Sequence, residues 1–247
     1  MTPFPILFED GEALVIDKPA GLPLDRPRAG GASLEDRVHE LRLGFERSPW
    51  PVHRLDQDTS GCLLMARNAK ALKRFSAAFE AREVEKVYLG IVAGLLEQDA
   101  GTIDLALSKI SSAEKGWRMI AAKKGKPSIT HWRKIAVVGG HTLVEFRPET
   151  GRTHQIRIHA LAGLGAPLVG DPIYGTGPNA PGGGAARTML HASALTVRRG
   201  EKPPIVAHAP LPEDFRALGF GEAEPAGEVQ HLQDAQIQPD AQLQQDD

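Results

Sequence analysis

Residues 53–61 hold the densest group of chemically capable side chains, in the order His-Arg-Leu-Asp-Gln-Asp-Thr-Ser-Gly. The apolar run of residues 62–66 follows directly, and a polar turn that leads into a buried strand is a common way to hold a site against a core. In an extended chain, Arg54, Asp56 and Asp58 point to the same side. An arginine beside a carboxylate keeps that carboxylate ionised, as a nucleophile requires. Asp56 is therefore a candidate nucleophile.

The same segment fits two other interpretations. Asp56 and Asp58 could accept hydrogen bonds from the amides of a structural turn, and residue types and spacing alone favour this interpretation. His53, Asp56 and Asp58 could instead ligate a metal ion in a metal-dependent hydrolase, although their spacing is loose. The chain has no phosphate-binding glycine loop, dinucleotide fingerprint or cysteine-rich zinc spacing, which argues against nucleotide-driven and redox chemistry.

A second polar segment, residues 147–159, contains Arg152, His154, Arg157 and His159. Polar side chains at the start of a helix could meet a carboxylate or a phosphate. A capped amphipathic helix with solvated arginines is the alternative. His154 and His159 lie about 140° apart around a helix, so they do not form the i,i+4 pair of a metalloprotease.

A third segment is basic and contains two tryptophans. Such a segment can follow a phosphate backbone and stack on bases, or can simply be a solvated charged hairpin. Its members are Lys109, Lys115, Trp117, Arg118, Lys123, Lys124, Lys126, Trp132 and Arg133.

The charge of the chain is unevenly distributed. The 247 residues carry a formal charge of −2, but residues 221–247 contain seven acids and no Lys or Arg, which leaves 24 acids against 29 basic residues, or +5, for the rest. A mildly basic body is compatible with a nucleic-acid partner. We expect one domain over residues 1–221 and an acidic, Gln-rich tail over residues 222–247 that is too polar to order itself.

The sequence lacks the features that would place the protein in a membrane or direct it to secretion. No window approaches the ~18 apolar residues of a membrane span. The first ten residues lack the basic start of a secretory signal. We expect a cytoplasmic monomer, and the lone Cys62, which lies in an apolar run, receives no catalytic role.

The apolar periodicity predicts an α+β fold around a large mixed sheet. Strands are expected over residues 14–16, 84–93, 129–138 and 141–146, the last two joined by a Gly-Gly turn. Helices are expected over residues 69–82 and from Thr153 through His159, the second closed by Gly163. In the strand over residues 84–93, alternation turns Lys86 and Tyr88 away from the more apolar face.

Four segments in the same order resemble the RluA-type family of RNA pseudouridine synthases, and together with weaker similarities they extend from about residue 8 to 215. The segments are residues 18–21 (Lys-Pro-Ala-Gly), 53–61, 151–157 (Gly-Arg-Thr-His-Gln-Ile-Arg) and 170–175 (Gly-Asp-Pro-Ile-Tyr-Gly). Only the acidic tail lies outside the resemblance. The family's frequent S4-like RNA-binding domain has no counterpart, so the chain is similar to a standalone catalytic domain.

The resemblance implies a central mixed, mostly antiparallel sheet with flanking helices and an RNA-binding cleft. It also implies that Asp56 attacks a uridine flipped out of its stack, with no cofactor and no metal. Arg54 would occupy the vacated space or hold a phosphate. Tyr88 would lie against the uracil and could assist removal of the C5 proton. Arg157 is the expected cation beside Asp56, with Arg152 as the alternative.

We further expect His53, Thr59 and Arg152 to contact the substrate or the RNA around it, and Lys123 and Lys124 of the basic segment to contact the RNA backbone. The expected substrate is large-subunit ribosomal RNA, transfer RNA or both, and the expected reaction is an isomerisation. The sequence leaves three routes open: addition of the carboxylate to C1′, addition to C6, or abstraction of the 2′ proton. A catalytically silent RNA-binding module and the metal-dependent hydrolase remain the rival functions.

Overall fold

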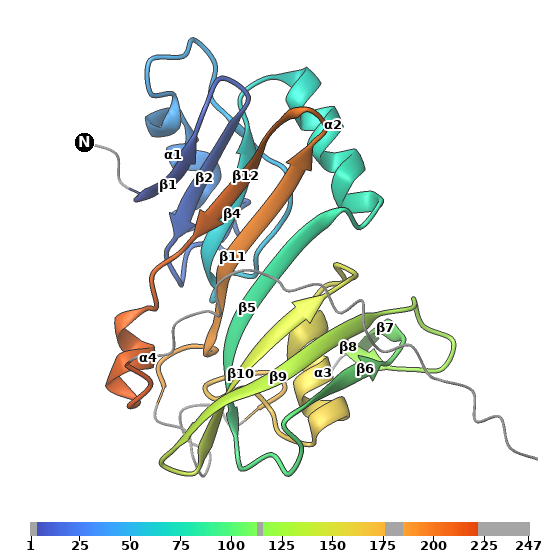
Figure 1. The fold of residues 1–247 in the computed structure, drawn as a ribbon. Coiled ribbons are helices and arrows are strands. Elements are labelled where there is room, and N and C mark those ends of the chain that lie inside the picture. Colours follow the sequence, from blue (N-terminus) through green and yellow to red (C-terminus); the bar gives the residue numbers. More distant parts are fainter. Residues whose placement is uncertain (1–3, 113–115, 176–184, 222–247) are drawn as a thin grey trace, which may run out of the picture.

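The structure, a computed structural model, describes residues 4–112, 116–175 and 185–221 (Figure 1). The strands are β1 (Ile6–Glu9), β2 (Ala13–Lys18), β3 (Trp50–Pro51), β4 (Ser60–Ala66), β5 (Val84–Ala93), β6 (Ala100–Asp104), β7 (Leu107–Ser112), β8 (Gly116–Ala121), β9 (Ile129–Val138), β10 (His141–Pro148), β11 (Leu190–Arg199) and β12 (Lys202–His208). The helices are α1 (Leu34–Arg37), the 3-10 helix η1 (Val38–Leu41), α2 (Ala69–Glu80), α3 (Gln155–Leu164) and α4 (Glu213–Ala217).

Ten of the described strands form one sheet in the order β1-β2-β4-β11-β5-β10-β9-β6, with β3 paired to β4 and β12 paired to β11. Within the described residues, β4 and β11 are the one parallel pair of named strands, and the other pairs are antiparallel. β5 runs through the middle of the sheet, while α2 lies beside the half with β4 and α3 beside the half with β9 (Figure 1). The predicted mixed, mostly antiparallel α+β fold is confirmed.

Local sequence signals account for most of these elements. The apolar run after the polar segment became β4, in which every residue is buried. The side chain of Asn68 accepts a hydrogen bond from the Ala71 amide and so begins α2. Gly139 and Gly140 both have positive φ, at 58° and 81°, which is the conformation a two-residue hairpin between β9 and β10 requires. The spacing of the apolar residues and the residue types at the turns therefore predicted these elements correctly.

The helix predicted to open at Thr153 and close at Gly163 is displaced along the chain. α3 begins after His154, which has a left-handed φ of 53°, and ends at Gly165, which has a φ of 66°. Gly163 lies inside the helix, where an added Cβ would come 2.6 Å from the side chain of Ile103 on β6. This glycine is thus required by the close approach of α3 to β6 and does not terminate the helix.

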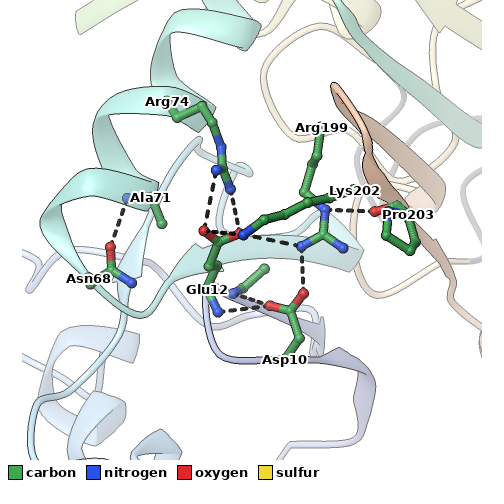
Figure 2. A network of polar contacts seen from close by, with 9 residues as sticks. Asp10, Glu12, Asn68, Ala71, Arg74, Arg199, Lys202 and Pro203 are labelled. Atoms are coloured by element: carbon green, nitrogen blue, oxygen red, sulfur yellow. Dashed lines mark hydrogen bonds and ion pairs between the residues drawn. The ribbon is translucent and has the colours of Figure 1, made fainter.

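A polar network joins the β1–β2 turn, α2 and the β11–β12 hairpin (Figure 2). Glu12 accepts hydrogen bonds from Arg74 at 2.7 Å and from Lys202 at 3.0 Å. Arg199 makes an ion pair with Asp10 in the same network. The bonds from Arg74 and Lys202 lower the pKa of Glu12 to about 2. This carboxylate therefore connects three chain segments in its ionised form.

One prediction falls on residues outside the described ranges, because the acidic tail over residues 222–247 lies there. The division into a domain and a tail stays a prediction. Among the helices that are described, none is long and apolar enough to cross a membrane.

We expect Glu12→Gln to lower the free energy of unfolding by on the order of 1 kcal/mol at neutral pH. Because folding lowers the pKa of Glu12 from 4.5 to about 2, its contribution is fully present above the unfolded value and is lost as the pH falls toward the folded value. Urea unfolding at a series of pH values measures the difference between the two proteins. A difference that stays constant down to the lowest pH would contradict this role, and Glu97→Gln, at an exposed carboxylate, is the matched control.

Candidate active site

Lys18, at the end of β2, holds the turn that carries Asp56. Its side chain is fully buried, and its ammonium group donates to the carbonyls of Pro19 at 2.8 Å, Leu22 at 2.9 Å and Gln57 at 3.0 Å. Burial lowers the pKa of Lys18 to about 8. All three donors of the ammonium group are used, so this lysine joins the loop after β2 to the turn of residues 53–59.

Arg187 fixes the same turn from the other side. Its Nη1 donates to the carbonyl of Asp58 at 3.1 Å, while its Nε and Nη2 bind the carboxylate of Asp214 at 2.6 and 2.9 Å. Just beyond the turn, Gly61 has a φ of 105°, and an added Cβ would lie 2.2 Å from the carbonyl oxygen of Ala192. Only glycine fits there, because β4 and β11 come into backbone contact at this residue.

Asp56 meets Arg157 of α3 across the cavity. The Nη1 of Arg157 donates to Oδ2 of Asp56 at 3.3 Å, and its Nε and Nη2 donate to the two oxygens of Asp171 at 2.7 and 2.8 Å. Arg152, the alternative partner in the sequence analysis, instead donates to the carbonyl of Pro127 at 3.4 Å. Arg157 is therefore the cation beside Asp56 in this structure.

The pKa shifts agree with this arrangement. Burial lowers the pKa of Arg157, but the hydrogen bond and charge of Asp171, together with Asp56, outweigh burial and raise it. Burial raises the pKa of Asp171, and the bonds from Arg157 outweigh that effect, so its pKa is lowered. Asp171 is fully buried. The bidentate pair fixes the guanidinium and leaves its third nitrogen for Asp56.

A cavity of about 480 Å³ opens above this pair. Seven of the predicted site residues line it: His53, Arg54, Asp56, Thr59, Tyr88, Arg152 and Arg157. Lys123 and Lys124 do not line it; they are exposed in the turn between β8 and β9. Asp58 does not line it either, because the chain turns at residues 57–58. The prediction that Arg54, Asp56 and Asp58 point to the same side is therefore correct for Arg54 and Asp56 and wrong for Asp58.

Tyr88 lines the cavity from β5, as strand parity predicted. Its neighbour Leu89 and the next alternate residue, Ile91, are buried in the core on the other face of the strand. Burial, and then the charge of Asp56, raise the pKa of Tyr88. Its hydroxyl is accordingly a neutral phenol in the free protein.

His53 lines the cavity but also has a structural task. Its Nε2 accepts a hydrogen bond from the amide of Leu64 at 3.0 Å, and its ring stacks on Phe79 with centroids 4.7 Å apart. Burial, followed by the charge of Lys86, lowers its pKa to about 3, so the ring is neutral. Across the described ranges, no three His, Cys, Asp or Glu side chains are grouped to hold a metal ion. The geometry does not favour the hydrolase.

Sequence reasoning missed a group beside Asp56. The Nε2 of His154 lies 3.8 Å from Oδ2 of Asp56, and its Nδ1 lies 2.7 Å from the hydroxyl of Tyr174. The ring of Trp117 on β8 stacks on His154 with centroids 5.2 Å apart. Tyr174 and Asp171 belong to the Gly-Asp-Pro-Ile-Tyr-Gly segment, and their place in that segment is the feature of the sequence that could have indicated this group.

Two further cations on the cavity wall were also missed. Arg82 follows α2, and Lys86 shares the cavity-facing side of β5 with Tyr88. Burial, and then the charge of Arg82, lower the pKa of Lys86 to about 8. An arginine and a lysine that repel each other beside an open cavity are suited to bind an anion.

Comparison with known proteins identifies the family. A model of the RNA pseudouridylate synthase family matches residues 12–162. The chain belongs to this family. It is 54% identical over 215 residues to an uncharacterised RNA pseudouridine synthase of Zymomonas mobilis, an alignment that covers 87% of this chain and 97% of the relative. It is 38% identical over 233 residues to ribosomal large subunit pseudouridine synthase D of Xanthomonas campestris, which covers 87% and 68%.

Solved structures agree with the assignment. Human RNA pseudouridylate synthase domain containing 1 superposes with a TM-score of 0.69 at 29% identity, covering 84% of this chain and 83% of that one. Human RNA pseudouridylate synthase domain containing 4 shows the same fold, with a TM-score of 0.71 at 23% identity over 87% and 92%. As a pseudouridine synthase the protein is an isomerase that acts on RNA, which agrees with the enzyme class expected from the sequence.

For this pseudouridine synthase we expect RNA affinity to weaken as the pH rises through about 8, because Lys86 then loses its proton. If binding a phosphate requires the charged amine, the loss approaches about tenfold per pH unit above that value. Fluorescence anisotropy with a labelled ribosomal RNA fragment at constant ionic strength measures it. Lys86→Arg, which keeps its charge, should flatten the profile. An unchanged profile in that variant would show that another group is responsible.

Proposed function

We propose that Asp56 is the catalytic carboxylate with which this enzyme converts uridine to pseudouridine in ribosomal RNA. The observation that supports this most directly is the contact between Asp56 and Arg157, a buried cation fixed by Asp171, at the floor of an open cavity. A fixed cation orients the carboxylate where charge changes during the reaction. Pseudouridine formation breaks the N1–C1′ bond and joins C1′ to C5, so it needs no external donor, oxidant or cofactor.

The neighbouring side chains suit the remaining steps. Tyr88 offers a neutral ring to the face of the uracil, and the loss of the charge on Asp56 in a covalent intermediate would remove one cause of its raised pKa. Arg54 is exposed at the cavity and is proposed to occupy the space of the flipped nucleotide or to hold its phosphate. Thr59 and Arg152 are proposed to contact the substrate from the cavity wall. All three chemical routes use the same carboxylate.

Large-subunit ribosomal RNA is the proposed substrate, because several relatives are named ribosomal large subunit pseudouridine synthase D. The target base must leave its stack, which costs a few kcal/mol. The cations of the cavity wall offset that cost by holding the displaced backbone. Transfer RNA is the alternative, and mapping pseudouridines in cellular RNA with and without the gene distinguishes the two.

We expect Asp56→Asn to lower the rate of pseudouridine formation by at least about 10⁴-fold. Its affinity for RNA should stay close to that of the unaltered protein, because the carboxylate is neither a phosphate ligand nor a support of the fold. Tritium release from C5-labelled uridine and anisotropy on the same RNA measure the two quantities. Turnover that survives this substitution would overturn the proposal.

Asp58→Asn is the matched control for that experiment. Asp58 is two residues away and outside the cavity lining, so turnover should persist. The metal-dependent hydrolase requires Asp58 as a ligand and predicts loss of activity in both variants and on addition of a chelator. An RNA-binding module without chemistry predicts no turnover in the unaltered protein.

We expect Lys123 and Lys124 changed together to Ala to weaken RNA binding and to reduce the slope of log affinity against log salt by about 1.5. Both lysines are exposed in the turn after β8, outside the cavity, so the turnover rate at saturating RNA should hold. Lys70 and Lys73, changed together to Ala on the exposed side of α2, remove the same charge as a control. Equal salt slopes for the two double variants would exclude the β8–β9 turn from the RNA interface.

A further inference from the structure

Beyond Arg157, a second group approaches the carboxylate of Asp56. His154 precedes α3 with its backbone in the left-handed region, at a φ of 53°. This turn directs its ring toward Asp56, with Nε2 at 3.8 Å from Oδ2. A left-handed conformation is uncommon for a residue other than glycine, and such backbone strain is concentrated at functional sites.

The hydrogen bonds of Tyr174 determine which nitrogen of His154 carries the proton. The hydroxyl oxygen of Tyr174 accepts a bond from the amide of Met119 at 2.9 Å. Its own proton is then available for Nδ1 of His154, 2.7 Å away. Because Nδ1 acts as an acceptor in this arrangement, the neutral ring carries its proton on Nε2, the nitrogen that faces Asp56.

The β7–β8 hairpin holds the ring in place. Trp117 stacks on one face of His154, and Met119 of the same strand provides the amide that binds Tyr174. Burial lowers the pKa of His154, and the charge of Asp56 opposes this shift, with a net decrease. The ring is thus a neutral, oriented donor.

We propose that His154 is a positioning residue that donates a second hydrogen bond from Nε2–H to Oδ2 of Asp56, the oxygen that also accepts from Arg157. The separation of 3.8 Å in the free protein is too long for a hydrogen bond, and catalytic hydrogen bonds often tighten only when substrate is bound. Two donors that converge on Oδ2 restrict the orientation of the carboxylate more tightly than Arg157 alone. The inference rests on the proposed role of Asp56.

Two substitutions separate the hydrogen bond to Asp56 from the hydrogen bond to Tyr174. In His154→Asn the side-chain oxygen takes the place of Nδ1 and still accepts from Tyr174, and asparagine tolerates the left-handed backbone. It places no donor near Asp56. In His154→Gln the amide nitrogen takes the place of Nε2 and restores that donor.

We expect His154→Asn to lower kcat by about 10- to 100-fold, the effect of losing one hydrogen bond to a charged group, while KM for RNA and the melting temperature stay unchanged. His154→Gln should recover a substantial part of kcat. A kcat like that of the unaltered protein in His154→Asn, or a kcat in His154→Gln as low as in His154→Asn, would overturn the proposal. A loss that appears mainly in KM would also overturn it, because it would indicate a contact with RNA.

A measurement independent of activity keeps this inference separate from the proposed function. The ¹⁵N chemical shifts of the imidazole distinguish a protonated from an unprotonated ring nitrogen. We expect His154 to be protonated at Nε2 in the unaltered protein and to become a mixture of tautomers in Tyr174→Phe. Protonation at Nδ1 in the unaltered protein would overturn the inference, whatever Asp56→Asn shows.

Discussion

The guanidinium of Arg157 is the group on which the site depends, because two carboxylates from distant parts of the chain share it. Asp171 is fully buried and binds two of its nitrogens, and Asp56 is 101 residues away in the sequence and takes the third. An unpaired buried charge costs about 3–5 kcal/mol, so neither Arg157 nor Asp171 can be removed without weakening the fold. The same contact that stabilises the packing of α3 therefore also orients the proposed nucleophile.

The sheet brings these residues together through one unusual strand pair. β4 and β11 run parallel and pair only over Ser60–Gly61 and His191–Ala192, after which β11 continues beside β12. This short contact needs a glycine at position 61. It places the turn that carries Asp56 next to the middle of β5, where Tyr88 pairs with Ala192. Backbone packing thus fixes the distance between the carboxylate and the aromatic ring.

The proposed catalytic carboxylate of Asp56 is surrounded mainly by basic side chains. Around Asp56 the cavity wall carries Arg54, Arg82, Lys86 and Arg152, while the network around Glu12 is internally paired. The net charge of −2 conceals this basic environment, because the acids that produce it are concentrated after residue 220. A polyanion would approach the cavity through its basic rim and meet the carboxylate of Asp56.

Local sequence patterns were enough to predict β4, α2, β5 and the β9–β10 hairpin, because the spacing of apolar residues and the residue types at turns act over only a few residues. Asp56 was identified as the candidate nucleophile from its motif, since residue types and spacing alone favoured a structural turn. Only the tertiary structure decided that Arg157, and not Arg152, meets Asp56, that His53 supports Leu64, and that His154 faces the carboxylate. Each of these depends on which segments the sheet brings together, and contacts between residues about a hundred positions apart leave no periodic signal in the sequence.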